Sequence, residues 1–196
     1  ADEHRLEEHL GGVDWSQTRA FAIGLTGIFI NTRGKFAQGI VEPGRDADQL
    51  REEIAAKLGK LVDPASGAAA IRRVYIAPKV YRGPYKDHAP DLIVGYESGY
   101  RVSWEAAVGR TTRDVFHDNT KAWSGDHCVD PSVVPGVLFC NRPIENEHPR
   151  LLDIGPTVLD LFGIATPDYM DGKPLVVGER RGGASKTPAA EMKVTA

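Results

Sequence analysis

A histidine in a tight turn is the side chain of this sequence best placed for chemistry. His127 follows Gly125 and Asp126, and an apolar run at residues 137–139 begins ten residues later. Gly and Asp are typical turn residues, and Pro131 excludes a helix through the segment. The run 137–139 predicts a short buried strand. A histidine held on a loop beside such a strand is well placed to bind a metal ion.

Other histidines and carboxylates allow more than one interpretation. His117 and Asp118 stand together in a polar stretch and could bind a metal or a substrate, although a solvated loop accounts for them more simply. Asp91 directly precedes an apolar run, so we interpret it as structural. Asp153 precedes a helical pattern and is predicted to be its N-cap.

The elements that must position these side chains follow from hydrophobic periodicity and turn residues. Apolar runs bounded by turn signals predict strands, and apolar residues at helical spacing predict helices. The expected strands are 20–23, 28–31, 71–76 and 91–95, and the expected helices are 46–61 and 153–162. Strands alternate with helices, which favours an α/β architecture. In such a sheet the functional loops gather at the carboxyl ends of the strands.

The composition of the chain argues against two classes of binding partner, nucleic-acid polymers and membranes. The chain has 196 residues and a net charge of -3, with no basic block for a nucleic-acid polymer and no basic amphipathic run for a membrane surface. Its apolar runs are too short to span a bilayer. Cys128 and Cys140 could pair, but two free thiols explain them as well, so no compartment is assigned. Trp104 and Trp123 are interpreted as anchors of a core or loop rather than as substrate platforms.

Four stretches late in the chain resemble a known family. In order and spacing they are similar to the C-terminal part of the alkaline phosphatase superfamily, and most of all to its type I phosphodiesterase and nucleotide pyrophosphatase branch. These stretches are 123–127, 134–139, 152–163 and 170–175, and four upstream pieces, 19–24, 27–31, 39–44 and 89–95, are similar to that branch too.

The resemblance covers about residues 13 to 175 and implies both a fold and a domain organisation. The expected fold is an alkaline-phosphatase-like α/β sheet flanked by helices, of which this chain holds the C-terminal portion. Residues 1–12 would be a lead-in helix or linker, 13–177 the portion of the catalytic domain, and 178–196 a disordered tail.

The resemblance also implies metal-dependent hydrolysis of a small-molecule phosphate ester. In the family two divalent ions, usually zinc, with manganese as an alternative, assist attack by a Thr or Ser on phosphorus. The histidine of the family's late Gly-x-His motif binds one of these ions, and it matches His127. Asp126 stands at the variable middle position of that motif. It would orient an imidazole without binding the metal itself, and a role as a turn cap is the alternative.

The family's other signatures are absent, because this chain has no Thr-rich nucleophile turn, no Asp-x-x-x-His pair and no Asp-His-Gly pair. We therefore expect no catalytic residue in this chain, a missing N-terminal half that supplies the nucleophile and the other metal ligands, and no activity of the chain alone. Phosphomonoesterase, phosphonate hydrolase and sulfatase-like activities stay open.

The alternative is a stand-alone, non-catalytic binding or interaction module. A half-sheet of that kind would expose an apolar edge and need a partner chain or self-association.

Overall fold

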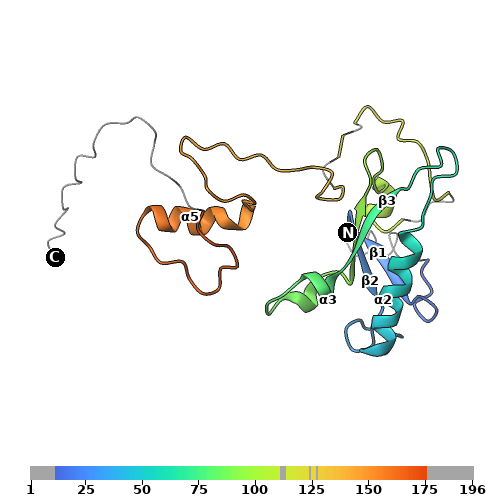
Figure 1. The fold of residues 1–196 in the computed structure, drawn as a ribbon. Coiled ribbons are helices and arrows are strands. Elements are labelled where there is room, and N and C mark those ends of the chain that lie inside the picture. Colours follow the sequence, from blue (N-terminus) through green and yellow to red (C-terminus); the bar gives the residue numbers. More distant parts are fainter. Residues whose placement is uncertain (1–11, 111–113, 124, 127, 176–196) are drawn as a thin grey trace, which may run out of the picture. The chain divides into compact units, whose positions relative to one another are not determined.

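The computed structural model describes residues 12–110, 114–123, 125–126 and 128–175 (Figure 1). The chain divides into two compact units, residues 1–135 and residues 136–196, and each is treated below by itself. The predicted lead-in segment up to residue 11 and the predicted tail after residue 177 lie outside the described residues.

The first unit is built on a four-stranded antiparallel sheet, which confirms a mixed α/β architecture. The strand order is β1-β2-β4-β3, and each of the three neighbouring pairs is antiparallel. All four strands lie within a residue of their predicted positions: β1 (Ala20–Ile23), β2 (Gly27–Ile30), β3 (Ile71–Ile76) and β4 (Leu92–Tyr96).

The expectation that functional loops share one carboxyl edge of the sheet is wrong for these strands. The crossover through the helix after β2 makes β2 and β3 run in the same direction, but β4 lies between them and is antiparallel to both. The carboxyl ends of neighbouring strands therefore lie at opposite edges. Periodicity identifies a buried strand, but it does not tell which strand becomes its neighbour.

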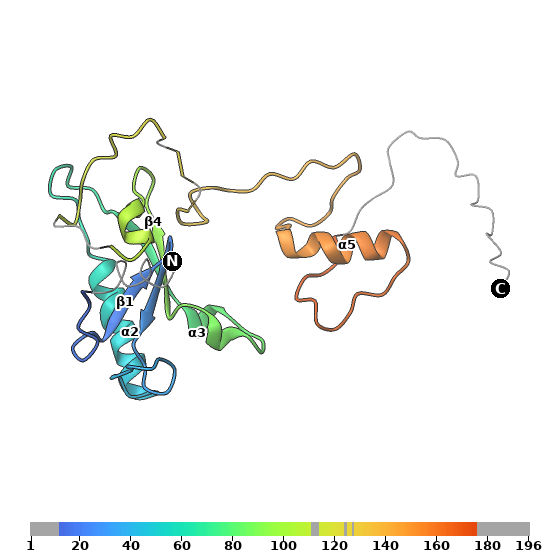
Figure 2. The same cartoon turned by 180° about the vertical axis from the view of Figure 1, so that it is seen from behind.

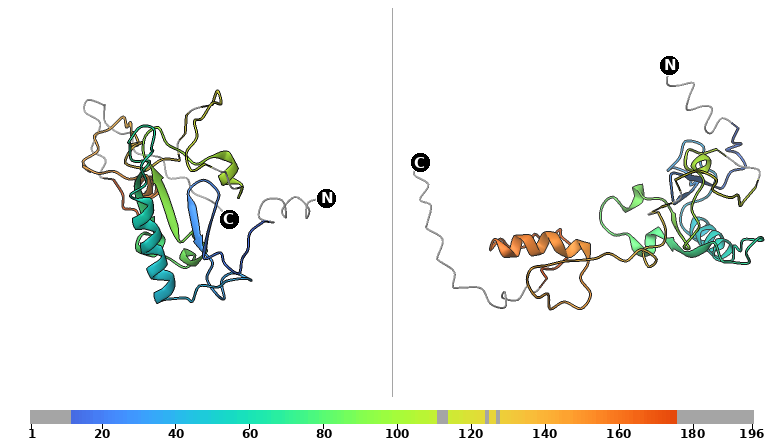
Figure 3. Two further views of the ribbon diagram at one scale, coloured as in Figure 1. Left: turned by 90° about the vertical axis from the view of Figure 1, so that its right-hand side faces the viewer. Right: turned by 90° about the horizontal axis from the view of Figure 1, so that it is seen from above.

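Helix α2 (Arg45–Leu58) covers one face of this sheet (Figure 3). Its Ala47 and Leu50 pack with Ile30 of β2 in a fully buried cluster. The helix ends at Leu58, before the predicted residue 61, because Gly59 takes the C-cap position and glycine is a poor helix former. The apolar stripe of the sequence thus becomes the helix–sheet interface.

Three short elements connect the longer ones. They are α3 (Ala77–Val80), which projects from the end of β3 (Figure 2), the 3-10 turn η1 (Lys86–His88) and α4 (Trp104–Ala107). None of the helices in the described ranges combines the length and the apolar character that crossing a bilayer requires.

A buried carboxylate fastens α2 to the sheet. Asp91, 5% exposed, accepts two hydrogen bonds on Oδ1 from Arg51, from Nε at 2.8 Å and from Nη2 at 2.6 Å. Its Oδ2 accepts the backbone N–H of Ile30 at 2.9 Å. Both oxygens are thus satisfied from two different elements, as a buried charge requires. The structural interpretation of Asp91 is confirmed.

The second unit contains the turn η2 (Leu151–Asp153) and helix α5 (Ile154–Leu161), which confirms the helix predicted at 153–162. Segment 170–175 is hydrogen-bonded to one side of this helix, where Thr157 Oγ1 accepts the N–H of Leu175 at 2.8 Å. Asp153 stands at the N-cap position, but its carboxylate does not cap α5. It accepts the N–H of Arg150 at 2.9 Å and that of Lys173 at 3.0 Å.

The buried strand predicted at residues 137–139 is wrong. The segment has no strand geometry, and Phe139 is 91% exposed. A strand needs a neighbouring strand to satisfy its backbone groups. The described part of the second unit, residues 136–175, contains no strand with which residues 137–139 could pair. The apolar character of the run is real, but nothing in its own unit covers it.

Removing the Asp91 carboxylate is expected to destabilise the first unit strongly. Asp91→Ala leaves the Arg51 guanidinium without its buried partner, which should lower the free energy of unfolding by about 3–5 kcal/mol. The matched control is Asp48→Ala, which removes the exposed partner of the same arginine and should cost less than about 1 kcal/mol. Urea unfolding followed by tryptophan fluorescence measures both, since all three tryptophans precede residue 136. Equal losses would contradict the assigned role.

Asp153 should titrate far below an ordinary carboxyl group. Hydrogen bonds from the Arg150 side chain and from the amides of Lys173 and Arg150 lower its pKa to about 2, against about 3.9 in an unfolded chain. Its contribution to stability is therefore complete above about pH 4 and is lost as the pH falls through about 2. The Arg150 and Lys173 amide resonances should shift with a midpoint near pH 2, and Asp153→Asn should abolish that shift. A midpoint near pH 4 would refute these hydrogen bonds.

Candidate functional site

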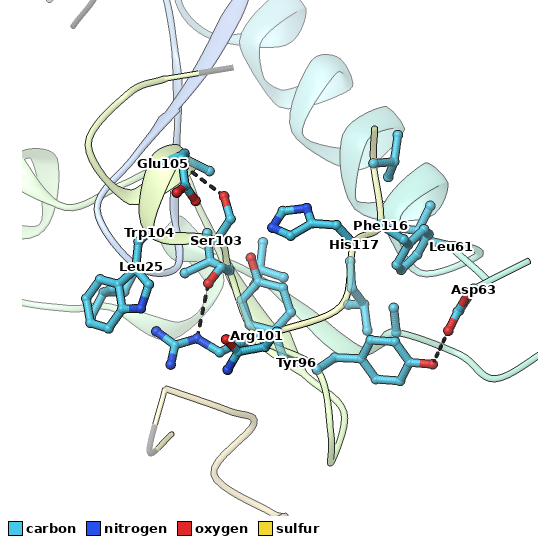
Figure 4. A pocket seen from close by; sticks show the side chains of 18 of the residues that line it. Leu25, Leu61, Asp63, Tyr96, Arg101, Ser103, Trp104, Glu105, Phe116 and His117 are labelled. Atoms are coloured by element: carbon cyan, nitrogen blue, oxygen red, sulfur yellow. Dashed lines mark hydrogen bonds between the residues drawn. The ribbon is translucent and has the colours of Figure 1, made fainter. Parts of the chain in front are cut away.

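A wide cleft of about 1070 Å³ opens in the first unit, beside the C-terminal end of α2 (Figure 4). Part of its wall is the second apolar cluster of the unit, in which Ala70, Ile71 and Val94 are buried. Ile28 of β2 and Leu58 of α2 pack against that cluster and also line the cleft. The cleft is therefore a part of the helix–sheet interface that the helix does not reach, because α2 ends at Leu58.

Aromatic side chains from separate segments line this cleft. They are Tyr96, Tyr100, Trp104 and Phe116. Tyr96 shares a sheet face with Val94 because strand side chains alternate. Burial raises the pKa of its hydroxyl, which therefore stays protonated. The rings of Tyr100 and Phe116 meet edge to face, with 6.2 Å between their centroids.

The loop that carries Trp104 is held in place by backbone and side-chain hydrogen bonds. Ser103 caps α4, since its Oγ accepts the N–H of Ala106 at 3.0 Å. The carbonyl of Ala107 accepts the N–H of Gly24 at 2.9 Å, and Gly24 has the positive φ of 80° that the turn between β1 and β2 requires. The wall of the cleft is thus attached to the hairpin of the sheet.

An ion pair connects this wall to the turn at Asp126, the turn in which the sequence predicts a metal ligand. Nε of Arg101 lies 3.0 Å from Oδ2 of Asp126, and their side chains are only 14% and 11% exposed. The same guanidinium lies over the ring of Trp104, 4.6 Å from its centroid, in cation–π geometry. Oδ1 of Asp126 accepts the N–H of Cys128 at 2.8 Å, a hydrogen bond typical of an Asx turn. Burial raises the pKa of the Cys128 thiol.

These contacts agree with the turn-cap interpretation of Asp126. His127 itself lies outside the described residues, so its role as a metal ligand stays a prediction, and so does an orienting role for Asp126. Both carboxylate oxygens of Asp126 are already engaged, by Arg101 and by Cys128. This arrangement suits a residue that fixes the turn, and it does not suit a direct metal ligand.

The described residues do not fit a two-metal centre. Within the ranges that the structure describes, no three His, Cys, Asp or Glu side chains gather closely enough to hold a metal ion. His117 and Asp118 line the cleft but are exposed. In Figure 4 the His117 imidazole lies on the far side of Tyr96 from Trp104. The ligands of any metal pair would therefore have to come largely from residues outside those described.

Sequence reasoning missed the cleft, although it named several of the residues around it. Trp104 was expected to be an anchor, and it does stack on Arg101, but it also lines the cleft. Nothing in the sequence next to Tyr96 or Phe116 indicated that these residues line a cleft. The one indication available was the apolar alternation 92–94–96, which places Tyr96 on the same sheet face as the core.

The chain matches no protein-family model, no curated protein and no solved structure. The interpretation of the site therefore rests on the geometry of these residues and on the sequence resemblance described above.

Replacing Arg101 should loosen the turn at Asp126. Arg101→Met keeps a long apolar side chain but leaves the buried Asp126 carboxylate without its cation, a loss that is costly in a partly buried site. The amide of Cys128, which donates to Asp126, should then exchange with solvent at least about tenfold faster, corresponding to about 1.4 kcal/mol. Arg110→Met, at an exposed position of the same loop region, is the control. Unchanged exchange in both variants would show that the ion pair does not hold the turn.

Proposed function

We propose that this chain is the C-terminal portion of the catalytic domain of a metal-dependent, phosphodiesterase or nucleotide-pyrophosphatase-like hydrolase of small-molecule phosphate esters. The order and spacing of the late stretches support this proposal, and the fold would be of the alkaline-phosphatase kind. The nucleophile and most metal ligands would lie outside this sequence. Within the chain, His127 would be the metal ligand, and Asp126 with Arg101 would hold its turn.

The observation that carries the proposal is the uncovered apolar surface of the second unit. Thr157 of α5 is hydrogen-bonded to segment 170–175, but Val158, Leu161 and the neighbouring Phe162 are exposed, Phe162 to 78%. The apolar run at 137–139 is exposed as well. Exposed large apolar side chains, where they gather into a patch, mark an interaction site. Further strands of a larger domain would cover it and would give the run 137–139 the neighbour that it lacks.

A specific observation also favours a second candidate function, that of a non-catalytic binding module. Among the described residues, those that line the cleft all fall within 22–121 of the first unit. Such a module would use the cleft for a ligand, and the apolar surface of the second unit for a partner chain or for self-association. The two candidates differ in one respect, because only the first predicts phosphate-ester hydrolysis once the missing residues are supplied.

Hydrolysis of bis(p-nitrophenyl) phosphate distinguishes the two candidates. The 196-residue chain with added zinc or manganese is expected to be inactive, since it lacks a nucleophile. A natural chain that extends upstream of Ala1 is expected to release p-nitrophenolate under the same conditions. Absence of turnover in both would favour the binding module. Turnover by the short chain would show that a complete site exists here and that the account of the missing nucleophile is wrong.

His127→Ala in the longer, active chain should reduce metal content and activity together. One of the few protein ligands of an ion is then removed, and such sites use only three or four of them. Metal analysis by mass spectrometry and the rate of ester hydrolysis measure the two effects. His117→Ala is the matched control, because it removes a histidine that the family motif does not match. If His127→Ala keeps full metal content and full activity, His127 is not a ligand.

A further inference from the structure

We infer that the cleft of the first unit binds a compound that has a flat aromatic ring system and carries no negative charge. The inference does not depend on the proposed function, because the described residues that line the cleft all fall within 22–121 and binding is measured on the chain without any reaction.

The composition of the walls favours flat rings. The cleft holds four aromatic side chains and an apolar wall continuous with the core, and its volume of about 1070 Å³ is at the upper end of the range typical of small-molecule sites. Trp104 stands at the rim and is half exposed, whereas Tyr96 and Phe116 are more deeply placed. Aromatic faces bind aromatic ligands through stacked and edge-to-face contacts.

Both basic side chains that line the cleft in the described ranges, Arg101 and Lys121, already lie beside a carboxylate, whereas no ion pair of the exposed Asp118 is found there. Arg101 is held by Asp126 at 3.0 Å, and Lys121 lies 4.0 Å from Glu105. The carboxylate of Asp63 accepts the amide of Ala65 and the hydroxyls of Ser66 and Tyr100, which lower its pKa. An anionic ligand would have to break one of these ion pairs to gain a cation. An uncharged ligand would not.

One hydroxyl remains available for a directional contact. In the described ranges no hydrogen-bond partner is found for the hydroxyl of Tyr96, whereas the hydroxyl of Tyr100 donates to Asp63 at 2.9 Å. Tyr96 lines the cleft together with Trp104 and His117, and in the view of Figure 4 its ring is drawn between theirs. This hydroxyl is not among the fully buried polar atoms that lack a partner in the described residues, and a ligand with a hydroxyl or carbonyl group would form a hydrogen bond with it directly.

Three matched probes test the chemistry of the ligand. Binding of 2-naphthol, 2-naphthoate and 2-decalol to the full 196-residue chain is measured by saturation-transfer NMR and titration. The first probe is aromatic and uncharged, the second aromatic and anionic, and the third uncharged but saturated. We expect 2-naphthol to bind at least about tenfold more tightly than either of the others. No detectable binding of 2-naphthol, or equal binding of all three, would overturn the inference.

Variants then place the ligand in the cleft. Trp104→Leu should weaken 2-naphthol binding at least about fivefold without disturbing the core, because Trp104 is exposed at the rim. Trp123→Leu, another exposed tryptophan that does not line the cleft, is its control. Tyr96→Phe should weaken binding while keeping the packing of the ring. Unchanged affinity in both cleft variants, with folding verified by circular dichroism, would show that the probe binds elsewhere.

Discussion

The first unit depends on the burial of the carboxylate of Asp91. A buried charge is tolerated only when its oxygens are fully satisfied, and here Arg51 of α2 and the backbone of Ile30 in β2 do so together. Because Asp91 stands directly before β4, the same contacts fix the helix, the neighbouring strand and the start of the central strand. These contacts hold α2 against the sheet, and the cleft opens beyond its end at Leu58.

The cleft and the turn at Asp126 form one continuous set of contacts in the first unit. Trp104 stacks on Arg101, Arg101 pairs with Asp126, and Asp126 accepts the amide of Cys128. If His127 is the metal ligand that we propose, its turn is anchored to the wall of a ligand-sized cleft. If the chain is a binding module, the same contacts simply hold one wall of the cleft in place. The geometry is the same in both cases, and only the chemistry outside the described residues differs.

The local sequence pattern was sufficient to predict most helices and strands, but it was not sufficient to predict the cleft. The strands at 20–23 and 71–76 could be predicted because alternation and turn residues are local properties. The strand expected at 137–139 was wrong because pairing depends on a neighbour that the pattern does not name. The antiparallel order could not be predicted for the same reason. The cleft was missed because Tyr96, Trp104 and Phe116 come together only through the placement of two loops.

The two ion pairs beside the cleft differ in their exposure, so dissolved salt would act on them unequally. The Arg101–Asp126 pair is largely buried, whereas the side chains of Lys121 and Glu105 are 57% and 45% exposed. Screening by mobile ions is strong for exposed charges and weak for buried ones. Raising the ionic strength would therefore weaken the attraction between Lys121 and Glu105 while leaving that between Arg101 and Asp126 almost unchanged.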